Sequence, residues 1–505
     1  MRALTTLSVC VLIVAAGTVA PIASGSTVPT AVFTSIPGDP TSHVPGLGPT
    51  REFRGFYKLY RSAFGRRLIF RSRSDAFQIE NGPVVLCDIA PDGTVSGSAL
   101  FDIGDPVPWS PGNTLNTVGE RMGVMDDGRC VVDTIDSVGD RYIVVGNAGG
   151  WSVAAKENEP IPGIPGATYG VILHEAHITN DGRVGLQSIN SGNLPTNSNT
   201  VNLFDGEVVA REGITVPLGQ AGGQANPMEF FDFQTYYHDA TGDSVMYAGD
   251  TNGDPNADYV VVVNGVVRLQ EGQLISFSPP FGPIATGTLN GIREMHMESN
   301  GDWFVRGGNS GGQDWVIRNG AVIARTGDPI HAGATETWSD LRDTATFFLH
   351  IGNNRGDVVV GGRTSNPVNT DGVLVLNNQT VLARLSDGVD VDGNGVADDD
   401  AFIALFRTDR AVLNDDGWVF VVALLRRGNG SDLGESLLRI RAFVPPAGCD
   451  GDMNWDGQVN GADLSILLGA FGGPASGPPG GDVNGDGVVN GADLSVLLAN
   501  FGCGS

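Results

Sequence analysis

The chain has 505 residues, and its 57 acidic against 30 basic residues give a formal net charge of −27. A negative excess of this size opposes binding to nucleic acid and to anionic membrane surfaces, so neither is expected as a partner. Beyond the N-terminal segment no stretch approaches eighteen consecutive apolar residues, so no membrane span is predicted.

The N-terminus carries one positive charge, Arg2, followed by an apolar run that is too short to span a membrane. The run leads into Ala23-Ser24-Gly25, small residues of the kind found at cleavage sites. Residues 1–25 are therefore predicted to be a secretory signal peptide, which implies a secreted protein, extracellular or at the cell surface. Cys10 lies inside the apolar run after Val9, so a lipoprotein anchor is not expected.

Four cysteines remain after the signal peptide, and an exported protein folds where disulfides are stable. Cys449 and Cys503 bracket the C-terminal repeats, so these two are predicted to pair. That leaves Cys87 with Cys130 as the second predicted disulfide. Free, buried thiols are the alternative for both pairs.

Residues 27–443 are predicted to form one long all-β domain, because valine and glycine are abundant and no helical period is sustained. A polar turn within a hydrophobic hairpin recurs every 54 to 61 residues, with its glycine at Gly128, Gly182, Gly242, Gly301, Gly356 and Gly417. A second hairpin signal lies between these turns, at Gly149-Gly150, Asp205-Gly206, Asn264-Gly265, Asn319-Gly320 and Asn378-Gln379.

Two hairpins in each period make four strands, which is the unit of a β-propeller blade. Six such blades are predicted between residues 115 and 443, and a less regular seventh around residues 53–102. The fold class is therefore mainly β, with a six- or seven-bladed propeller-like body. A pair of stacked β-sandwiches is the alternative.

Two acidic loops in the body place oxygen-bearing side chains at positions 1, 3, 5 and 9, a spacing that suits Ca²⁺. Both resemble the calcium loops of FG-GAP propellers, although Pro255 replaces the usual glycine in the first and neither has a carboxylate at position 12. Ordinary turn chemistry is the alternative. The candidate ligands are Asp250, Asn252, Asp254 and Asp258, and Asp390, Asp392, Asn394 and Asp398.

Catalytic residues cannot be assigned from the sequence, which has no nucleophile elbow and no phosphate-binding loop. A glycosidase carboxylate pair stays open, because its members meet only in the fold. Four histidines precede the inner turns at equivalent positions and could line one ring of a central channel, as metal ligands or as ordinary strand residues: His177, His238, His296 and His350. Sugar stacking or core packing is considered for Trp109, Trp151, Trp303, Trp338 and Trp418.

A Pro/Gly linker at 444–448 precedes residues 449–505, where one string occurs twice, thirty residues apart. Each copy is a twelve-residue loop with oxygen ligands at positions 1, 3, 5, 7, 9 and 12 and glycine at position 6, the arrangement that Ca²⁺ requires. Position 7 needs only a backbone carbonyl, so valine serves there. The predicted ligands are Asp452, Asn454, Asp456, Gln458, Asn460 and Asp463, then Asp482, Asn484, Asp486, Val488, Asn490 and Asp493.

Each loop is followed by the pattern Leu-x-x-Leu-Leu-x-x-Phe, one apolar stripe of a helix, and then by a capping glycine, Gly472 or Gly502. No helix pattern precedes either loop. Each unit is therefore predicted to be a loop plus one helix, and the two units to bury their Leu/Phe stripes against each other.

This duplicated segment resembles a type I dockerin, the calcium-binding module of secreted polysaccharide-degrading assemblies. The resemblance implies Ca²⁺ as cofactor and a cohesin-like domain as partner. Positions 10 and 11, where family members carry partner-recognition residues, are here Gly461-Ala462 and Gly491-Ala492, which leaves cohesin recognition open. A flexible Asp/Asn/Gly-rich tail is the alternative, but such a tail needs no Leu/Phe stripe.

The sequence thus predicts a secreted calcium-binding protein whose body recognises carbohydrate or protein without catalysis. The alternative is a polysaccharide-degrading enzyme, a glycoside hydrolase or lyase. This hypothesis depends only on the fact that dockerins occur in such enzymes. A channel mouth with two carboxylates and aromatic platforms would favour the enzyme.

Overall fold

The computed structural model describes residues 28–48, 50–74, 82–232, 235–275, 284–285, 291–339, 345–443, 451, 453, 459–473, 481, 483 and 488–503. The signal peptide (1–25) and the linker (444–448) lie outside these ranges, so both stay predictions. Within the described ranges, no helix has the length and apolar character needed to cross a membrane.

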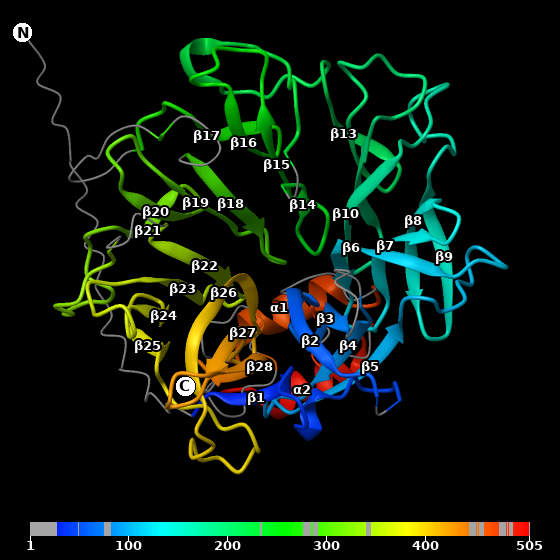
Figure 1. Cartoon of the computed structure of the whole chain (residues 1–505). Coiled ribbons are helices and arrows are strands. Elements are labelled where there is room, and N and C mark those ends of the chain that lie inside the picture. The colour runs from blue at the N-terminus through cyan, green and yellow to red at the C-terminus, as the bar shows by residue number, and fades with distance from the viewer. Residues whose placement is uncertain are drawn as a thin grey trace, which may run out of the picture.

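The described part of the chain forms seven four-stranded antiparallel sheets that surround a common centre (Figure 1). This is a seven-bladed β-propeller, so the propeller prediction is confirmed with seven blades, and the alternative of stacked sandwiches is wrong. In each of blades 1 to 6 the chain runs from the innermost strand outward as a meander.

Blades 1 to 3 comprise strands β2 (Phe53–Arg61), β3 (Arg67–Ser74), β4 (Val84–Ile89) and β5 (Val95–Phe101); β6 (Leu115–Val124), β7 (Cys130–Asp136), β8 (Arg141–Asn147) and β9 (Gly150–Lys156); and β10 (Ile172–Ile178), β11 (Val184–Ile189), β12 (Val201–Phe204) and β13 (Glu207–Arg211). The less regular stretch around residues 53–102 is therefore a complete first blade.

Blades 4 to 6 comprise β14 (Tyr237–His238), β15 (Val245–Asp250), β16 (Tyr259–Val263) and β17 (Val266–Gln270); β18 (Ile292–Met297), β19 (Trp303–Gly308), β20 (Asp314–Arg318) and β21 (Ala321–Arg325); and β22 (Phe347–Gly352), β23 (Val358–Arg363), β24 (Gly372–Leu376) and β25 (Thr380–Arg384). Two short 3₁₀ helices lie outside the blades, η1 (Pro40–Ser42) and η2 (Ala221–Gly223).

Blade 7 joins the two ends of the body, and its strands are β26 (Phe402–Leu413), β27 (Trp418–Arg426), β28 (Asp432–Arg441) and, outermost, β1 (Thr30–Thr34). β1 pairs antiparallel with β28, from Thr30 opposite Arg439 to Thr34 opposite Ser436. The first strand of the chain therefore closes the ring on the last blade. Blade 7 therefore contains both the beginning and the end of the propeller body.

The repeated turns have the conformation that their residues favour. Both central residues of the outer hairpins in blades 3 to 6 have positive φ, as in Asn264 (53°) and Gly265 (75°), which is the type I′ geometry that matches the twist of paired strands. Each inner turn ends in a glycine with positive φ, from 74° at Gly242 to 89° at Gly128 and Gly182. The regular glycine spacing in the sequence is thus the spacing of these turns.

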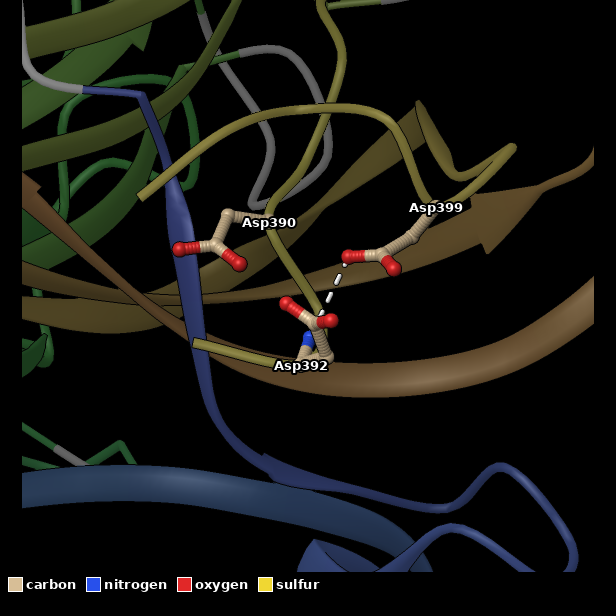
Figure 2. Close-up of side chains that lie close together, drawn as sticks. All are labelled: Asp390, Asp392 and Asp399. Atoms are coloured by element: carbon tan, nitrogen blue, oxygen red, sulfur yellow. Dashed lines mark hydrogen bonds between the residues drawn. The ribbon is translucent and has the colours of Figure 1, made fainter. Parts of the chain in front are cut away.

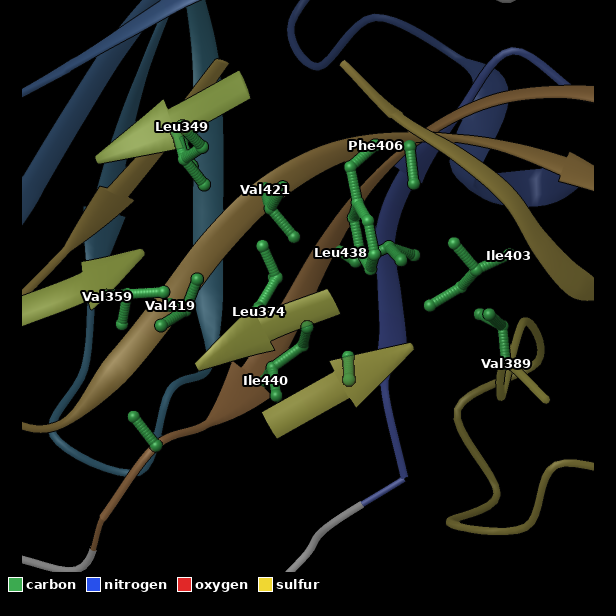
Figure 3. Close-up of a cluster of buried hydrophobic side chains, with 14 of the residues drawn as sticks. Leu349, Val359, Leu374, Val389, Ile403, Phe406, Val419, Val421, Leu438 and Ile440 are labelled. Atoms are coloured by element: carbon green, nitrogen blue, oxygen red, sulfur yellow. The ribbon is translucent and has the colours of Figure 1, made fainter. Parts of the chain in front are cut away.

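The hydrophobic core lies between neighbouring blades. One cluster combines Val359 and Leu374 of blade 6 with Val419, Val421 and Ile440 of blade 7 (Figure 3). Because blades are covered by their neighbours on both faces, some middle strands are buried along their whole length, as are β16 and β24. This burial explains why the sequences of these strands are continuous runs of mainly valine and leucine.

The second predicted disulfide is wrong, because Cys87 and Cys130 are free, buried thiols. Cys87 on β4 packs in a cluster with Phe53 and Phe70, whereas Cys130 on β7 packs in a different cluster with Val132. The two side chains thus face separate interblade cores. Cys503 is not among the free thiols, but Cys449 lies outside the described residues, and their pairing stays a prediction.

The C-terminal segment contributes helices α1 (Gly461–Ala470) and α2 (Gly491–Ala499), one after each predicted loop. No other α-helix occurs in the described ranges. The pattern of one loop plus one helix in each repeat is therefore confirmed for the helices.

Candidate functional site

Position 12 of each C-terminal loop is buried and directed back over its own loop. The carboxylate of Asp463 accepts hydrogen bonds from the backbone N–H groups of Asn460 (2.8 Å) and Met453 (2.6 Å), and the residue has no exposed surface. Asp493 repeats this geometry with Asn490 and Val483, both at 2.8 Å. In this way the last predicted ligand of each loop is fixed at the start of a helix.

The helix N-termini explain why these residues fold in this way. Asn460 and Asn490 cap α1 and α2, each accepting from the backbone N–H two residues on, and each forms a reciprocal capping box with the aspartate three residues later. Predicted ligands at positions 9 and 12 therefore also begin the helices. Val488 is described as well, whereas seven predicted ligands lie outside the described residues: Asp452, Asn454, Asp456, Gln458, Asp482, Asn484 and Asp486.

The two repeats exchange backbone hydrogen bonds. Gly502 donates to Val459 of the first loop (2.8 Å), and Gly472 donates to Val489 of the second (2.8 Å). Each loop is thus tied to the end of the other repeat's helix, so the two units form one module with approximate twofold equivalence.

Only part of the Leu/Phe stripe is buried in this module. Leu467 and Leu497 are fully buried between the repeats, as predicted. The following residues of each stripe remain about half exposed, which corrects the expectation that the whole stripe packs internally: Leu468 (55%), Phe471 (48%), Leu498 (53%) and Phe501 (50%).

The acidic loop between blades 6 and 7 gathers three carboxylates. Oxygen atoms of Asp390, Asp392 and Asp399 lie within 4.8 Å of one another (Figure 2). Asp399 takes the place in this group that the sequence pattern gave to Asp398, while Asn394 Nδ2 contacts Asp392 Oδ2 (3.2 Å) and Asp398 Oδ1 (3.4 Å) at its edge. The donor set, all oxygen, suits a hard cation such as Ca²⁺.

In the acidic loop after β15, the candidate ligand side chains do not lie around a common centre. Asp250, Asn252, Asp254 and Asp258 do not form a group of three metal-ligating side chains in the described residues. Burial, and then the charges of Asp258, Asp232 and Glu229, raise the pKa of Asp250 to about 6. The loop therefore concentrates negative charge without a shared ligand position.

A cavity of 190 Å³ lies at the centre of the ring. All seven innermost strands contribute to its wall: β2, β6, β10, β14, β18, β22 and β26.

The four histidines line this cavity from blades 3 to 6, but they form two pairs rather than one ring. The ring centroids of His177 and His238 are 4.9 Å apart, and those of His296 and His350 are 4.8 Å apart. Burial lowers the pKa of His177 to about 4 and, together with the charge of His177, that of His238 to about 2, so both rings are neutral near pH 7. Among described residues these histidines are part of no three-ligand metal group.

Ion pairs cross the cavity between blades that are not neighbours. Lys58 Nζ of blade 1 lies 3.0 Å from Glu294 Oε1 of blade 5, and Arg61 Nη2 lies 2.7 Å from Glu298 Oε2 on the same two sides. These pairs join β2 to the segment around β18, more than two hundred residues away in sequence. Sequence spacing carried no signal for them.

Two further pairs complete this charged layer. Arg121 Nε of blade 2 lies 3.3 Å from Glu175 Oε2 of blade 3, and its Nη2 donates to the Tyr237 hydroxyl of blade 4 (2.5 Å). Arg306 of blade 5 forms a two-pronged pair with Asp409 of blade 7, both contacts at 2.7 Å. The four carboxylates of this layer thus each face a cation from another blade.

The ion pairs lower the pKa of two cavity glutamates, whereas burial raises the pKa of Asp409 despite its pair with Arg306. Although burial alone would raise the pKa of Glu298, Arg61, His296 and the Gly352 N–H outweigh it and lower the pKa to about 2. Burial also acts to raise the pKa of Glu294. The charges of Lys58 and, to a smaller extent, Arg306 outweigh burial, so the pKa of Glu294 is lowered. Neither glutamate holds the proton that a glycosidase acid donates at neutral pH.

The five tryptophans weighed for sugar stacking do not line the cavity in the described structure. Trp109 and Trp151 pack against each other with centroids 5.7 Å apart, Trp338 is buried, and Trp418 Nε1 donates to the Pro91 carbonyl (3.0 Å). Core and turn packing is therefore their role, including for Trp303, which is 7% exposed.

Residues 450–501 match the family model of the dockerin type I domain. No curated protein matches the chain. The C-terminal module is therefore dockerin-like, and the family model covers about a tenth of the sequence.

Solved structures resemble the body only distantly. An uncharacterised protein of Listeria monocytogenes EGD-e has 7% identity over 76% of this chain and 97% of its own, with a TM-score of 0.37. YCF48 from Cyanidioschyzon merolae has 11% identity over 79% and 98%, with a TM-score of 0.32. The Cps50 (Swd1) β-propeller domain of Myceliophthora thermophila has 10% identity over 78% and 99%, with a TM-score of 0.33. No functional argument rests on these likenesses.

Proposed function

We propose that this is a secreted calcium-binding protein in which a dockerin-like module docks the chain to a protein partner and a seven-bladed propeller recognises carbohydrate or protein without catalysis. Dockerin domains typically bind cohesin domains and occur in extracellular proteins, which supports both the partner class and the location.

The observation that carries the proposal is the burial of Asp463 and Asp493. Each is fully buried and oriented toward its own loop, at position 12 of a calcium-loop pattern. Two backbone hydrogen bonds hold each carboxylate over its loop, and carboxylate oxygens are the ligands that Ca²⁺ prefers. Ca²⁺ in each loop, held by the twelve residues of the two patterns, completes the module and contributes folding energy to it.

The half-exposed apolar residues give the module a docking surface. Leu468 and Phe471 in one repeat correspond to Leu498 and Phe501 in the other, so the same apolar patch occurs twice. Exposed patches of this kind are typical of protein interaction sites. Because positions 10 and 11 are Gly-Ala in both repeats, we assign recognition to these patches and to a cohesin-like partner.

The propeller loop at Asp390, Asp392 and Asp399 is assigned as a weaker third calcium site, with Asn394 and Asp398 at its edge. The loop at Asp250, Asn252, Asp254 and Asp258 is assigned lower affinity still, because its ligands share no centre.

Calcium titration of the full mature chain by calorimetry tests the proposal. Two tight sites are expected, and Asp463→Asn and Asp493→Asn are each expected to remove one. Asp390→Asn should affect only a weaker third site, and Asp243→Asn, an exposed aspartate, serves as matched control. Equal stoichiometry in the wild type and both tail variants would show that these carboxylates bind no metal. Hydrolysis of a polysaccharide panel would instead favour the enzyme alternative.

A further inference from the structure

We propose that the central cavity is a binding site for one neutral, hydroxyl-rich ligand unit, such as a single sugar residue of a glycan. The inference rests on the carbohydrate arm of the proposed function and assigns it to one place in the fold. It concerns the cavity formed by the seven innermost strands.

The cavity wall presents polar groups with unused hydrogen-bonding capacity. The side chains of Lys58 (23% exposed), Glu294 (19%), His296 (18%) and Asp409 (17%) line the cavity and retain exposed surface there. An ammonium group has three donors and a carboxylate about four acceptor positions, so one ion-pair contact leaves several of each. Neutral hydroxyl groups can both donate to and accept from such groups, and bonds to charged partners are the stronger ones.

The cavity does not favour a charged ligand. Its cations and carboxylates already pair across the ring, Lys58 with Glu294 and Arg61 with Glu298. An anion would compete with these glutamates and a cation with the basic residues, and either exchange leaves a buried charge without its partner. A neutral ligand leaves all pairs intact.

The histidines of the cavity wall do not fit a metal ion. His177 and His238 form one pair and His296 and His350 another, and among described residues no third ligand completes either pair. His350 is buried, and burial followed by the charge of His296 holds its pKa well below the usual range. The rings of His177, His238 and His350 are therefore neutral parts of the wall near pH 7.

The volume and lining of the cavity limit the size of its ligand. A volume of 190 Å³ corresponds to about six water molecules at roughly 30 Å³ each, which suits one ring-sized unit and excludes a folded partner. Met297, Ile351 and Val412 add apolar surface to the wall. Mixed apolar walls with a few convergent polar groups are typical of small-molecule sites, and a sugar ring has apolar C–H faces as well as hydroxyls.

The experiment uses the full mature chain with calcium present and an array of neutral, acidic and amino glycans, followed by calorimetry on the best neutral glycan. The double variant Lys58→Met/Glu294→Gln removes the ion pair as a unit, so no buried charge loses its partner. Ser299→Trp blocks the cavity wall from a turn residue, and Ser96→Trp on an exposed face is its matched control. A melting curve of each variant verifies folding.

At least tenfold weaker binding of the neutral glycan is expected for the double variant and for Ser299→Trp, with Ser96→Trp unchanged. Neutral-glycan binding that survives both cavity variants would place recognition elsewhere on the body, overturning this inference while leaving the proposed function intact. Preference for acidic or amino glycans, or histidine-dependent Zn²⁺ binding, would likewise overturn it. Absence of any glycan binding would also remove the carbohydrate arm of the proposed function, whereas calcium binding is judged by its own titration.

Discussion

Glu298 connects three parts of the ring, and its replacement by glutamine provides a quantitative test of the cavity electrostatics. Its carboxylate accepts from Arg61 of blade 1 (2.7 Å), from the Gly352 N–H of blade 6 (2.7 Å) and from His296 Nε2 (3.0 Å). The residue is 9% exposed, so solvent screens these contacts little.

The magnitude follows from the pKa. Arg61, His296 and Gly352 outweigh the effect of burial and lower the pKa of Glu298 from 4.5 to about 2. At 1.36 kcal/mol per pKa unit this contributes about 3 kcal/mol to the free energy of unfolding. Because the folded-state pKa is depressed, the contribution is complete above the unfolded pKa and is lost as pH falls toward 2; about 1 kcal/mol remains at pH 3.

Glu298→Gln is therefore expected to lower the free energy of unfolding by about 3 kcal/mol at pH 7 and by about 1 kcal/mol at pH 3. Urea unfolding of the calcium-loaded chain at both pH values measures this difference. Glu207→Gln, on the exposed edge of β13, is the control and should change stability little. A loss under 0.5 kcal/mol at pH 7, or an equal loss at both pH values, would refute the electrostatic reasoning.

Three further predictions concern other parts of the body. Burial raises the pKa of Asp133 to about 7, so stability should fall as pH rises through that value, and Asp133→Asn should abolish a loss of roughly 2–3 kcal/mol between pH 5 and pH 8 in urea unfolding. Persistence of the loss in the variant would assign it to another group. Cys87 and Cys130 should resist alkylation in the folded chain, because both are buried and burial raises the pKa of each thiol. After unfolding without reductant, two thiols should react. If no thiol reacts, Cys87 and Cys130 form a disulfide. Phe33→Ala should lower the free energy of unfolding by about 3–5 kcal/mol, because the Phe33 ring on β1 packs against Phe53 with centroids 5.3 Å apart. The control Val153→Ala, at an exposed position, should change the free energy of unfolding little. Equal losses in the two variants would show that β1 does not stabilise the body by packing.

The sequence predicted the propeller because its turns repeat. Gly182 and Gly301 mark inner hairpins, and Asn264-Gly265 and Asn319-Gly320 mark outer ones, so blade length could be read from local residues alone. Blade 1 was less clear, because its strands lack that turn pattern. The closing strand β1 was not predicted, since its partner Arg439 is about four hundred residues away and pairing of that range leaves no local signature.

A functional site could be predicted from the sequence only where a single loop contains all of its residues. The positions of Asp463 and Asp493 follow from a local pattern, whereas in the body loop Asp399, not Asp398, lies with Asp390 and Asp392 and accepts from the Val391 N–H. The cavity pairs were missed because Lys58 and Glu294 meet only when the ring closes. Thiol burial at Cys87 is equally a property of the assembled blades.

The pairing of β1 with β28 has a kinetic consequence. Six blades can form from contacts within or between adjacent segments, but the seventh lacks its outer strand until the whole body has been synthesised and its beginning returns to its end. Such long-range contacts form slowly, because the chain loses conformational entropy on closing the loop before the contacts between its ends stabilise it. A body truncated within blade 7 should therefore persist as an open, aggregation-prone arc.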